Sequence, residues 1–149
     1  MKKLFISFYV ILTLLYSCNT APETEKLKEE IKQTDIDFSD YSAKNGMNKA
    51  FIRYFDSTGV LLRPNQNPIE GLEKITLILS KRSDTAFTLT WKPSFADVSS
   101  SGDLGYTYGI WEVALKDTVF RGTYATIWKK NKNGEWKMVL DTGNDGLSE

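Results

Sequence analysis

Few side chains in this sequence could carry out proton transfer or nucleophilic chemistry. The chain of 149 residues has no histidine and a single cysteine, Cys18. The lack of histidine removes the commonest general base and the commonest transition-metal ligand. A carboxylate is the base that remains, and three acidic residues are candidates: Asp56, Glu112 and Asp141. We expect no metal site and no cofactor.

Aromatic residues and one arginine are candidates for a binding pocket around such a carboxylate. Tyr106 and Tyr108 are two residues apart, so they point to the same face of an extended strand. Their rings either pack in the core or at a dimer interface, or they form a pocket wall that offers phenol donors. Trp91 is a candidate for the core or for the same wall. Arg63, next to a proline in a loop, either binds a structural carboxylate or meets an acidic ligand.

Asp141 has two alternative interpretations. It either forms an ion pair with Arg121 or Lys137, or it is a pocket acid whose pKa is raised by burial. Many aromatic residues combined with few catalytic groups favour the binding of a small apolar or weakly acidic molecule. An interaction module of the cell envelope is one alternative. An enzyme that uses a buried carboxylate base on an apolar carbonyl compound is another.

Length and composition indicate one packed domain. Charges are balanced, with 19 Lys and Arg against 19 Asp and Glu, so nothing points to a nucleic-acid partner. Hydrophobic residues make up 41% of the chain and aromatic residues 13%, which is enough for a core.

The first residues read MKKLFISFYVILTLLYSC, which is typical of a bacterial lipoprotein signal. Two lysines precede an apolar run that is too short for a comfortable transmembrane helix. The run ends in LLYSC, which resembles a lipobox. We therefore expect a signal peptide over residues 1–17, lipid on Cys18, a tether over residues 18–24, and a domain over residues 25–149 that is anchored to a membrane of the cell envelope.

The first half of the domain is predicted to be mostly helical. Leu27, Ile31 and Phe38 recur at helical spacing, and Gly46 is a good helix C-cap. Two shorter helices are expected over about residues 47–55 and 72–79, with a short strand over residues 60–62 between them.

The second half alternates as antiparallel strands do, and predicts a meander of four strands. The turn between the last two contains Asn133-Gly134, a strong hairpin signal. The stretch GDLGYTYG holds three glycines, but no helix follows them, so we expect no phosphate site. Gly105 and Gly109 share one face of their strand, which indicates strong curvature or space left for something above it. Helices followed by an antiparallel sheet make an α+β domain.

Several of these segments together resemble the SnoaL-like, nuclear transport factor 2-like superfamily. They are VLLRP, SGDLGYTYG and GTYATIWKKNKNGEWKMVLDTGN, and the resemblance covers about residues 35–145. The DUF4440 group of uncharacterised bacterial lipoproteins is the most similar branch.

This resemblance implies a cone, in which a curved antiparallel sheet of about four long strands and one short strand wraps around the N-terminal helices. It also implies a pocket at the open end and a homodimer formed through the outer face of the sheet. Some relatives are isomerases, cyclases or dehydratases, and others bind molecules without chemistry. An isomerase-like or cyclase-like activity therefore stays an alternative to simple binding.

Overall fold

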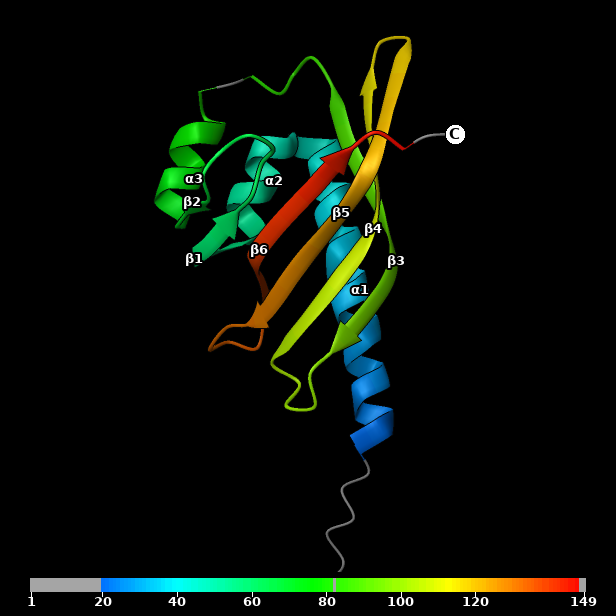
Figure 1. Cartoon of the computed structure of the whole chain (residues 1–149). Helices are drawn as coiled ribbons and strands as arrows, with labels where there is room; N and C mark the ends of the chain where they lie inside the picture. Colours follow the sequence, from blue (N-terminus) through cyan, green and yellow to red (C-terminus); the bar gives the residue numbers. More distant parts are fainter. Residues whose placement is uncertain (1–19, 82, 148–149) are drawn as a thin grey trace, which may run out of the picture.

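A computed structural model describes residues 20–81 and 83–147 of the chain (Figure 1). It is an α+β domain in which three helices come before most of the sheet. The elements in chain order are α1 (Thr20–Asn45), α2 (Met47–Tyr54), β1 (Phe55–Leu61), β2 (Ile69–Glu70), α3 (Leu72–Leu79), β3 (Thr88–Val98), β4 (Leu104–Leu115), β5 (Thr118–Lys130) and β6 (Trp136–Asp145). Within these residues, no helix has the length and apolar character needed to cross a bilayer.

The six strands form one curved sheet in the order β2-β1-β6-β5-β4-β3. The strands from β3 to β6 make the antiparallel meander that the sequence predicts. β1 joins the sheet differently, because it pairs parallel to β6 and antiparallel to β2. α1 runs along one face of the sheet, and α2 and α3 lie at the β1 end (Figure 1).

Three boundaries differ from the sequence prediction. α1 begins at Thr20, so residues 20–24, predicted as a tether, are helical. β1 begins at Phe55, which was assigned to the second helix and instead opens the strand. β2 has only two residues, Ile69 and Glu70, and is too short to leave a periodic signal. Gly46 ends α1 as expected, and its φ of 92° lies in the left-handed region that favours glycine.

The core lies between α1 and the sheet. Ile31 and Phe38, which belong to the predicted helical stripe, are fully or almost fully buried. The ring of Phe38 lies 4.4 Å from that of Trp91 and 5.1 Å from that of Phe51, measured between centroids. Trp128 is completely buried. Edge-to-face aromatic pairs of this kind add to the free energy gained by burial alone.

Gly105 explains how α1 comes so close to β4. A Cβ atom at this position would lie 2.8 Å from Cδ1 of Ile31 in α1. The face of β4 that α1 covers carries Gly105, Thr107 and Gly109, all of them buried. Small side chains on that face let the helix pack against the backbone, and the large side chains that alternate with them, Leu104, Tyr106 and Tyr108, point outward.

Candidate functional site

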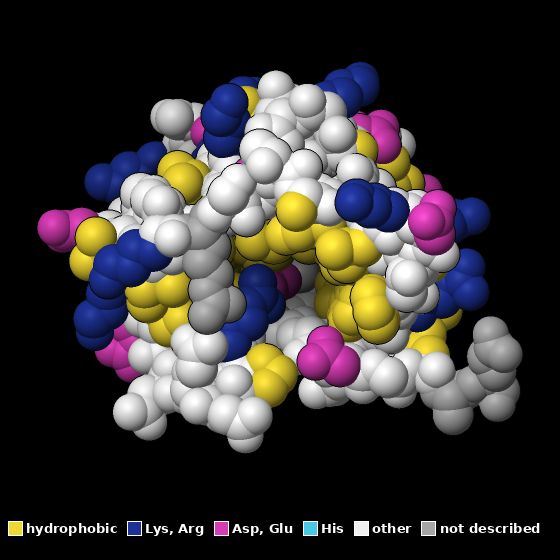
Figure 2. All heavy atoms as spheres, turned by 90° about the horizontal axis from the view of Figure 1, so that it is seen from above, with side chains coloured by type: hydrophobic (Ala, Val, Ile, Leu, Met, Phe, Trp, Pro, Cys, Tyr) yellow, Lys and Arg dark blue, Asp and Glu magenta, His cyan; other side chains and the backbone are white. Residues whose placement is uncertain are grey.

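A cavity of about 470 Å³ opens between the sheet, α2 and α3. This volume is within the usual range of small-molecule sites. Figure 2 shows the opening from above, walled by hydrophobic side chains, with basic and acidic side chains visible in its depth. The apolar lining includes Phe38, Met47, Phe51, Leu79, Trp91 and Trp111.

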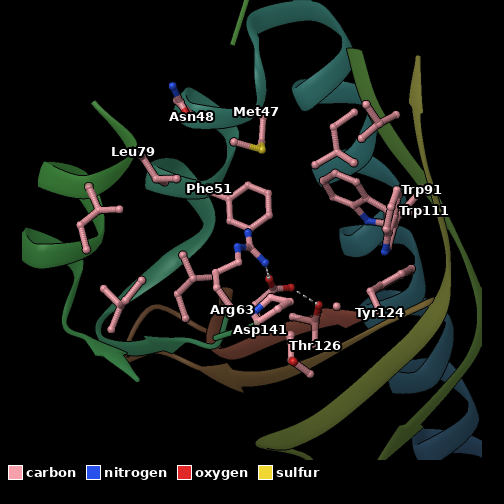
Figure 3. Close-up of a pocket in the computed structure, with 18 of the residues that line it drawn as sticks. Met47, Asn48, Phe51, Arg63, Leu79, Trp91, Trp111, Tyr124, Thr126 and Asp141 are labelled. Atoms are coloured by element: carbon pink, nitrogen blue, oxygen red, sulfur yellow. Dashed lines mark hydrogen bonds and ion pairs between the residues drawn. The ribbon is translucent and has the colours of Figure 1, made fainter. Parts of the chain in front are cut away.

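Two groups of elements supply opposite walls of the cavity (Figure 3). Met47 and Phe51 come from α2, while Trp91, Trp111 and Tyr124 come from the strands. Trp111 lies over Gly122 of the neighbouring strand, where a Cβ atom would collide with the indole ring. The glycine thus makes room for the ring, and the indole N–H donates a hydrogen bond of 3.1 Å to the carbonyl of Thr123.

An ion pair lies among these apolar walls. The Arg63 guanidinium contacts Asp141 with 3.4 Å between Nη1 and Oδ1. Thr126 donates its hydroxyl to the other carboxylate oxygen, Oδ2, at 3.0 Å. The guanidinium also lies over the ring of Phe51, 5.4 Å from its centroid. The loop after β1 thereby brings a cation against a carboxylate of β6, 78 positions later in the chain.

Asp141 is almost fully buried, with 5% of its surface exposed. Desolvation raises the pKa of its carboxyl, and Arg63 and the Thr126 hydroxyl act in the opposite direction. Because Arg63 and Thr126 partly offset the desolvation, the Asp141 carboxylate can hold a negative charge beside Arg63. It still gains a proton more readily than an exposed aspartate does.

A second buried carboxylate, Asp35 of α1, fixes the aromatic wall from behind. It accepts a hydrogen bond from Trp91 Nε1 and another from the Tyr124 hydroxyl, each 2.7 Å long. Asp35 has no exposed surface, and burial raises its pKa from 3.8 to about 6. The same environment raises the pKa of Tyr124. Because this phenol donates to Asp35, its hydrogen is already used, and Arg63, Asp141 and Thr126 are among the polar groups of the lining that remain for a ligand.

Sequence reasoning did not identify Asp35 as a functional residue, although a signal was present. Asp35 follows Ile31 by four residues and precedes Phe38 by three, so it lies on the apolar stripe of the helix. A carboxylate on a core-facing stripe must find buried donors, because an unpaired buried charge is costly. That requirement indicates a polar partner across the core.

The structure brings together three of the predicted site residues: Trp91, Arg63 and Asp141 all line the cavity. The ion-pair partners expected for Asp141 were wrong. Arg121 instead pairs with Glu112 at 2.8 Å, and Lys137 contacts the carbonyl of Arg53. Strand alternation explains this difference, because Asp141 faces the interior of the fold.

The other predicted site residues lie outside the cavity lining. Tyr106 and Tyr108 are 42% and 46% exposed on the outer face of β4, because its inner face is the small-residue face that α1 covers. Glu112 shares that outer face with its partner Arg121. Asp56 accepts hydrogen bonds from the backbone and hydroxyl of Thr58, which lower its pKa. None of these four predicted residues lines the cavity.

The structure does not test two further predictions, the lipid on Cys18 and the lack of a metal ion. Cys18 lies outside the described residues, so its lipidation stays a prediction. Within residues 20–81 and 83–147, no group of three acidic or cysteine side chains is placed to hold a metal ion.

Comparison with known proteins adds to the fold assignment. No protein-family model matches the chain, and no curated protein matches it. Several solved structures do match. An NTF2-like protein with a cystatin-like fold from Novosphingobium aromaticivorans aligns with a TM-score of 0.67 and 13% identity, over 89% of this chain and 90% of that one.

Two more solved structures align over similar shares. A domain of unknown function with a cystatin-like fold from Nostoc punctiforme gives a TM-score of 0.67 and 15% identity, over 81% of this chain and 78% of that one. A ketosteroid isomerase-like protein from Erwinia carotovora atroseptica gives a TM-score of 0.64 and 12% identity, over 80% of this chain and 96% of that one. The curved sheet, the helices that cover it and these alignments agree that the chain has the NTF2-like, cystatin-like fold.

Proposed function

We propose that this protein is a lipid-anchored protein of the bacterial cell envelope that binds a small apolar or weakly acidic molecule in the cavity between the sheet, α2 and α3. The observation that carries this proposal is the cavity itself, with mostly apolar walls and a few convergent polar groups. Ligand pockets usually combine these two features. A ligand would place its apolar body against Phe51, Trp91 and Trp111, and its polar end against Arg63 and Asp141.

The orientation of the domain is compatible with an anchor on Cys18. α1 has 26 residues and is thus about 39 Å long. Its N-terminal end lies at the bottom of the view in Figure 1, whereas the cavity opens in the view from above in Figure 2. Since Cys18 precedes Thr20 by two positions, lipid on that cysteine would attach near the end of α1 that lies opposite the mouth of the cavity (Figure 1, Figure 2).

A thermal unfolding experiment tests the binding proposal. Naphthylethanol, a neutral apolar probe, should raise the unfolding temperature in a concentration-dependent way. A ligand at a hundred times its Kd stabilises the folded state by about 2.7 kcal/mol. Val113, half-buried at the cavity wall, offers a variant that fills the space, Val113→Trp. Leu77→Trp is the matched control because Leu77 is exposed and outside the lining.

Binding is supported if the probe stabilises the wild type and Leu77→Trp but not Val113→Trp. Equal stabilisation of both variants would place the probe elsewhere on the surface. No stabilisation of any form would contradict the proposal.

A second candidate function is an enzyme that uses Asp141 as a base on an apolar carbonyl compound. One observation favours it: the carboxyl is buried inside an apolar cavity, and its pKa is raised. Exchange of the hydrogens beside the carbonyl of naphthylacetone for deuterium, followed by NMR, tests this function. An enzyme should accelerate the exchange, and Asp141→Asn should reduce the rate by orders of magnitude without abolishing binding.

The outer face of the sheet supports a homodimer. Phe95, Leu104, Tyr106, Tyr108 and Ile110 are each more than 40% exposed. They form a continuous apolar surface, because Phe95 pairs with Tyr108 across the strands and their rings stack 5.4 Å apart. Apolar patches of this kind mark interaction sites in soluble proteins. We propose a second copy of the chain as the partner, and a scaffold role for this face as the alternative.

A further inference from the structure

The guanidinium of Arg63 has unused hydrogen-bonding capacity inside the cavity. Its side chain is 28% exposed and lines the pocket. The one hydrogen bond assigned to it among the described residues is the long contact of 3.4 Å to Asp141. A guanidinium carries five N–H donors in a planar fork that suits a carboxylate. Phe51, which lies under the guanidinium, holds the fork in place without using any donor.

The partner of Arg63 is a carboxylate that depends on it. Asp141 receives one hydrogen bond from Arg63 and one from Thr126. The other titratable groups near Asp141 are Tyr124 of β5, whose hydroxyl donates to Asp35, and Asp35 of α1, whose charge interacts unfavourably with that of Asp141. Lys81 and Asp145 also line the cavity. Among the described residues, Arg63 is therefore the only cation in contact with this carboxylate.

A second carboxylate at Arg63 would create a site with two anions and one cation. Two carboxylates close together cannot both stay ionised at low cost in a desolvated site, so one of them takes up a proton. The shared proton then lies between the two carboxyl groups, and the guanidinium neutralises the remaining negative charge. The aromatic residues Phe51, Trp91 and Trp111 around this group favour a ligand that contains a ring.

We propose that the ligand is a ring-bearing apolar carboxylic acid whose carboxylate binds to Arg63, and that the pair formed by this carboxylate and Asp141 takes up one proton from solvent on binding. This inference rests on the proposed binding function and specifies its ligand class. No covalent bond forms or breaks. Affinity for such an acid should therefore fall as pH rises, whereas affinity for a neutral analogue should not.

The experiment is calorimetric titration of the purified protein with two matched probes. Naphthylacetate and naphthylethanol share a ring system and differ in carrying a carboxylate or a hydroxyl group. Each titration is repeated in buffers with different ionisation enthalpies, which gives the number of protons exchanged. We expect the binding of naphthylacetate to be accompanied by the uptake of close to one proton, and the binding of naphthylethanol by none. Over the pH range in which one proton is taken up, the affinity for naphthylacetate should fall about tenfold per pH unit, as linkage requires.

Variants of the ion pair identify the groups involved. Asp141→Asn should abolish proton uptake and the pH dependence, and should still bind naphthylacetate. Arg63→Gln should lower the affinity for naphthylacetate at least tenfold and change the affinity for naphthylethanol less than about twofold. Because Arg63→Gln leaves Asp141 buried without its cation, a double variant with Asp141→Asn keeps the test valid if the single variant fails to fold. Arg121→Gln, on the outer face, is the control and should not change the affinity for either probe.

The outcomes separate the two proposals. If neither probe binds, the binding function is wrong, and the ligand class is wrong with it. If naphthylethanol binds but naphthylacetate binds no better at neutral pH, or binds without proton uptake, the ligand class alone is wrong. Retained preference for the acid in the double variant would likewise exclude Arg63 as its partner.

Discussion

The buried carboxylate of Asp35 should make the stability of this protein depend on pH in a defined window. Its pKa is raised from 3.8 to about 6, chiefly by desolvation. The folded state thus holds this proton more tightly than the unfolded state does. The stabilising contribution of the protonated carboxyl is complete below about pH 3.8 and is lost as pH rises through about 6.

The magnitude follows from the same two values. Each tenfold difference in proton affinity corresponds to about 1.4 kcal/mol, so the change from 3.8 to about 6 gives a loss of about 3 kcal/mol. Asp35→Asn removes the titration. Its amide oxygen can still accept from Trp91, and its NH₂ group can donate to the Tyr124 hydroxyl. The variant should therefore become more stable relative to wild type by about 3 kcal/mol between pH 3.8 and about pH 6.

Urea unfolding of both proteins at a series of pH values measures this difference. Other titrating groups largely cancel between the two proteins, so the difference in unfolding free energy isolates Asp35. Asp37→Asn removes an exposed carboxylate from the same helix, and its effect should stay below about 0.5 kcal/mol. A difference between Asp35→Asn and wild type that does not change with pH would refute the assignment of Asp35 as a desolvated, titrating group.

Three further predictions address the anchor, the dimer and the packing of α1. Cys18→Ser should abolish labelling by a radioactive fatty acid in cells, and equal labelling of both forms, or of neither, would contradict the anchor. The soluble chain from Asn19 onward should be dimeric by light scattering at tens of micromolar, and Tyr108→Asp should make it monomeric; a monomeric wild type would exclude the dimer. Gly105→Val should lower the unfolding free energy by about 2 kcal/mol or more, because its side chain would collide with the carbonyl oxygen of Asp97 in β3 and with Ile31 in α1; unchanged stability in urea would show that β4 does not pack as closely against these neighbours as described.

Local patterns in the sequence predict most of the elements. The helical stripe of α1 and the alternation of β3 to β6 each depend on residues a few positions apart, and these predictions are confirmed. The parallel pairing of β1 with β6 is different, because it joins segments about 80 positions apart and leaves no local signal. β2 pairs only with β1, and its two residues likewise leave no local signal in the sequence.

The candidate site could be predicted only in part, for two physical reasons. Tyr106 and Tyr108 were candidates for a pocket wall, with packing in the core or at a dimer interface as the alternatives. The close packing of α1 on the small residues of β4 places both tyrosines on the outer face, and a strand pattern alone cannot show which face that is. Arg63 and Asp141 were both candidates, but their pairing depends on the β1–β6 contact. Partners brought together by non-local strand pairing require the fold to be known.

The central claim is that the cavity binds an apolar molecule, and a crystal structure with a brominated naphthylacetate tests it most directly. Anomalous scattering locates the bromine without reference to the protein density. We expect the bromine signal between Phe51, Trp91 and Trp111, with the carboxylate within hydrogen-bonding distance of Arg63. A cavity filled by its own side chains, or a bromine signal only on the outer surface, would contradict the claim.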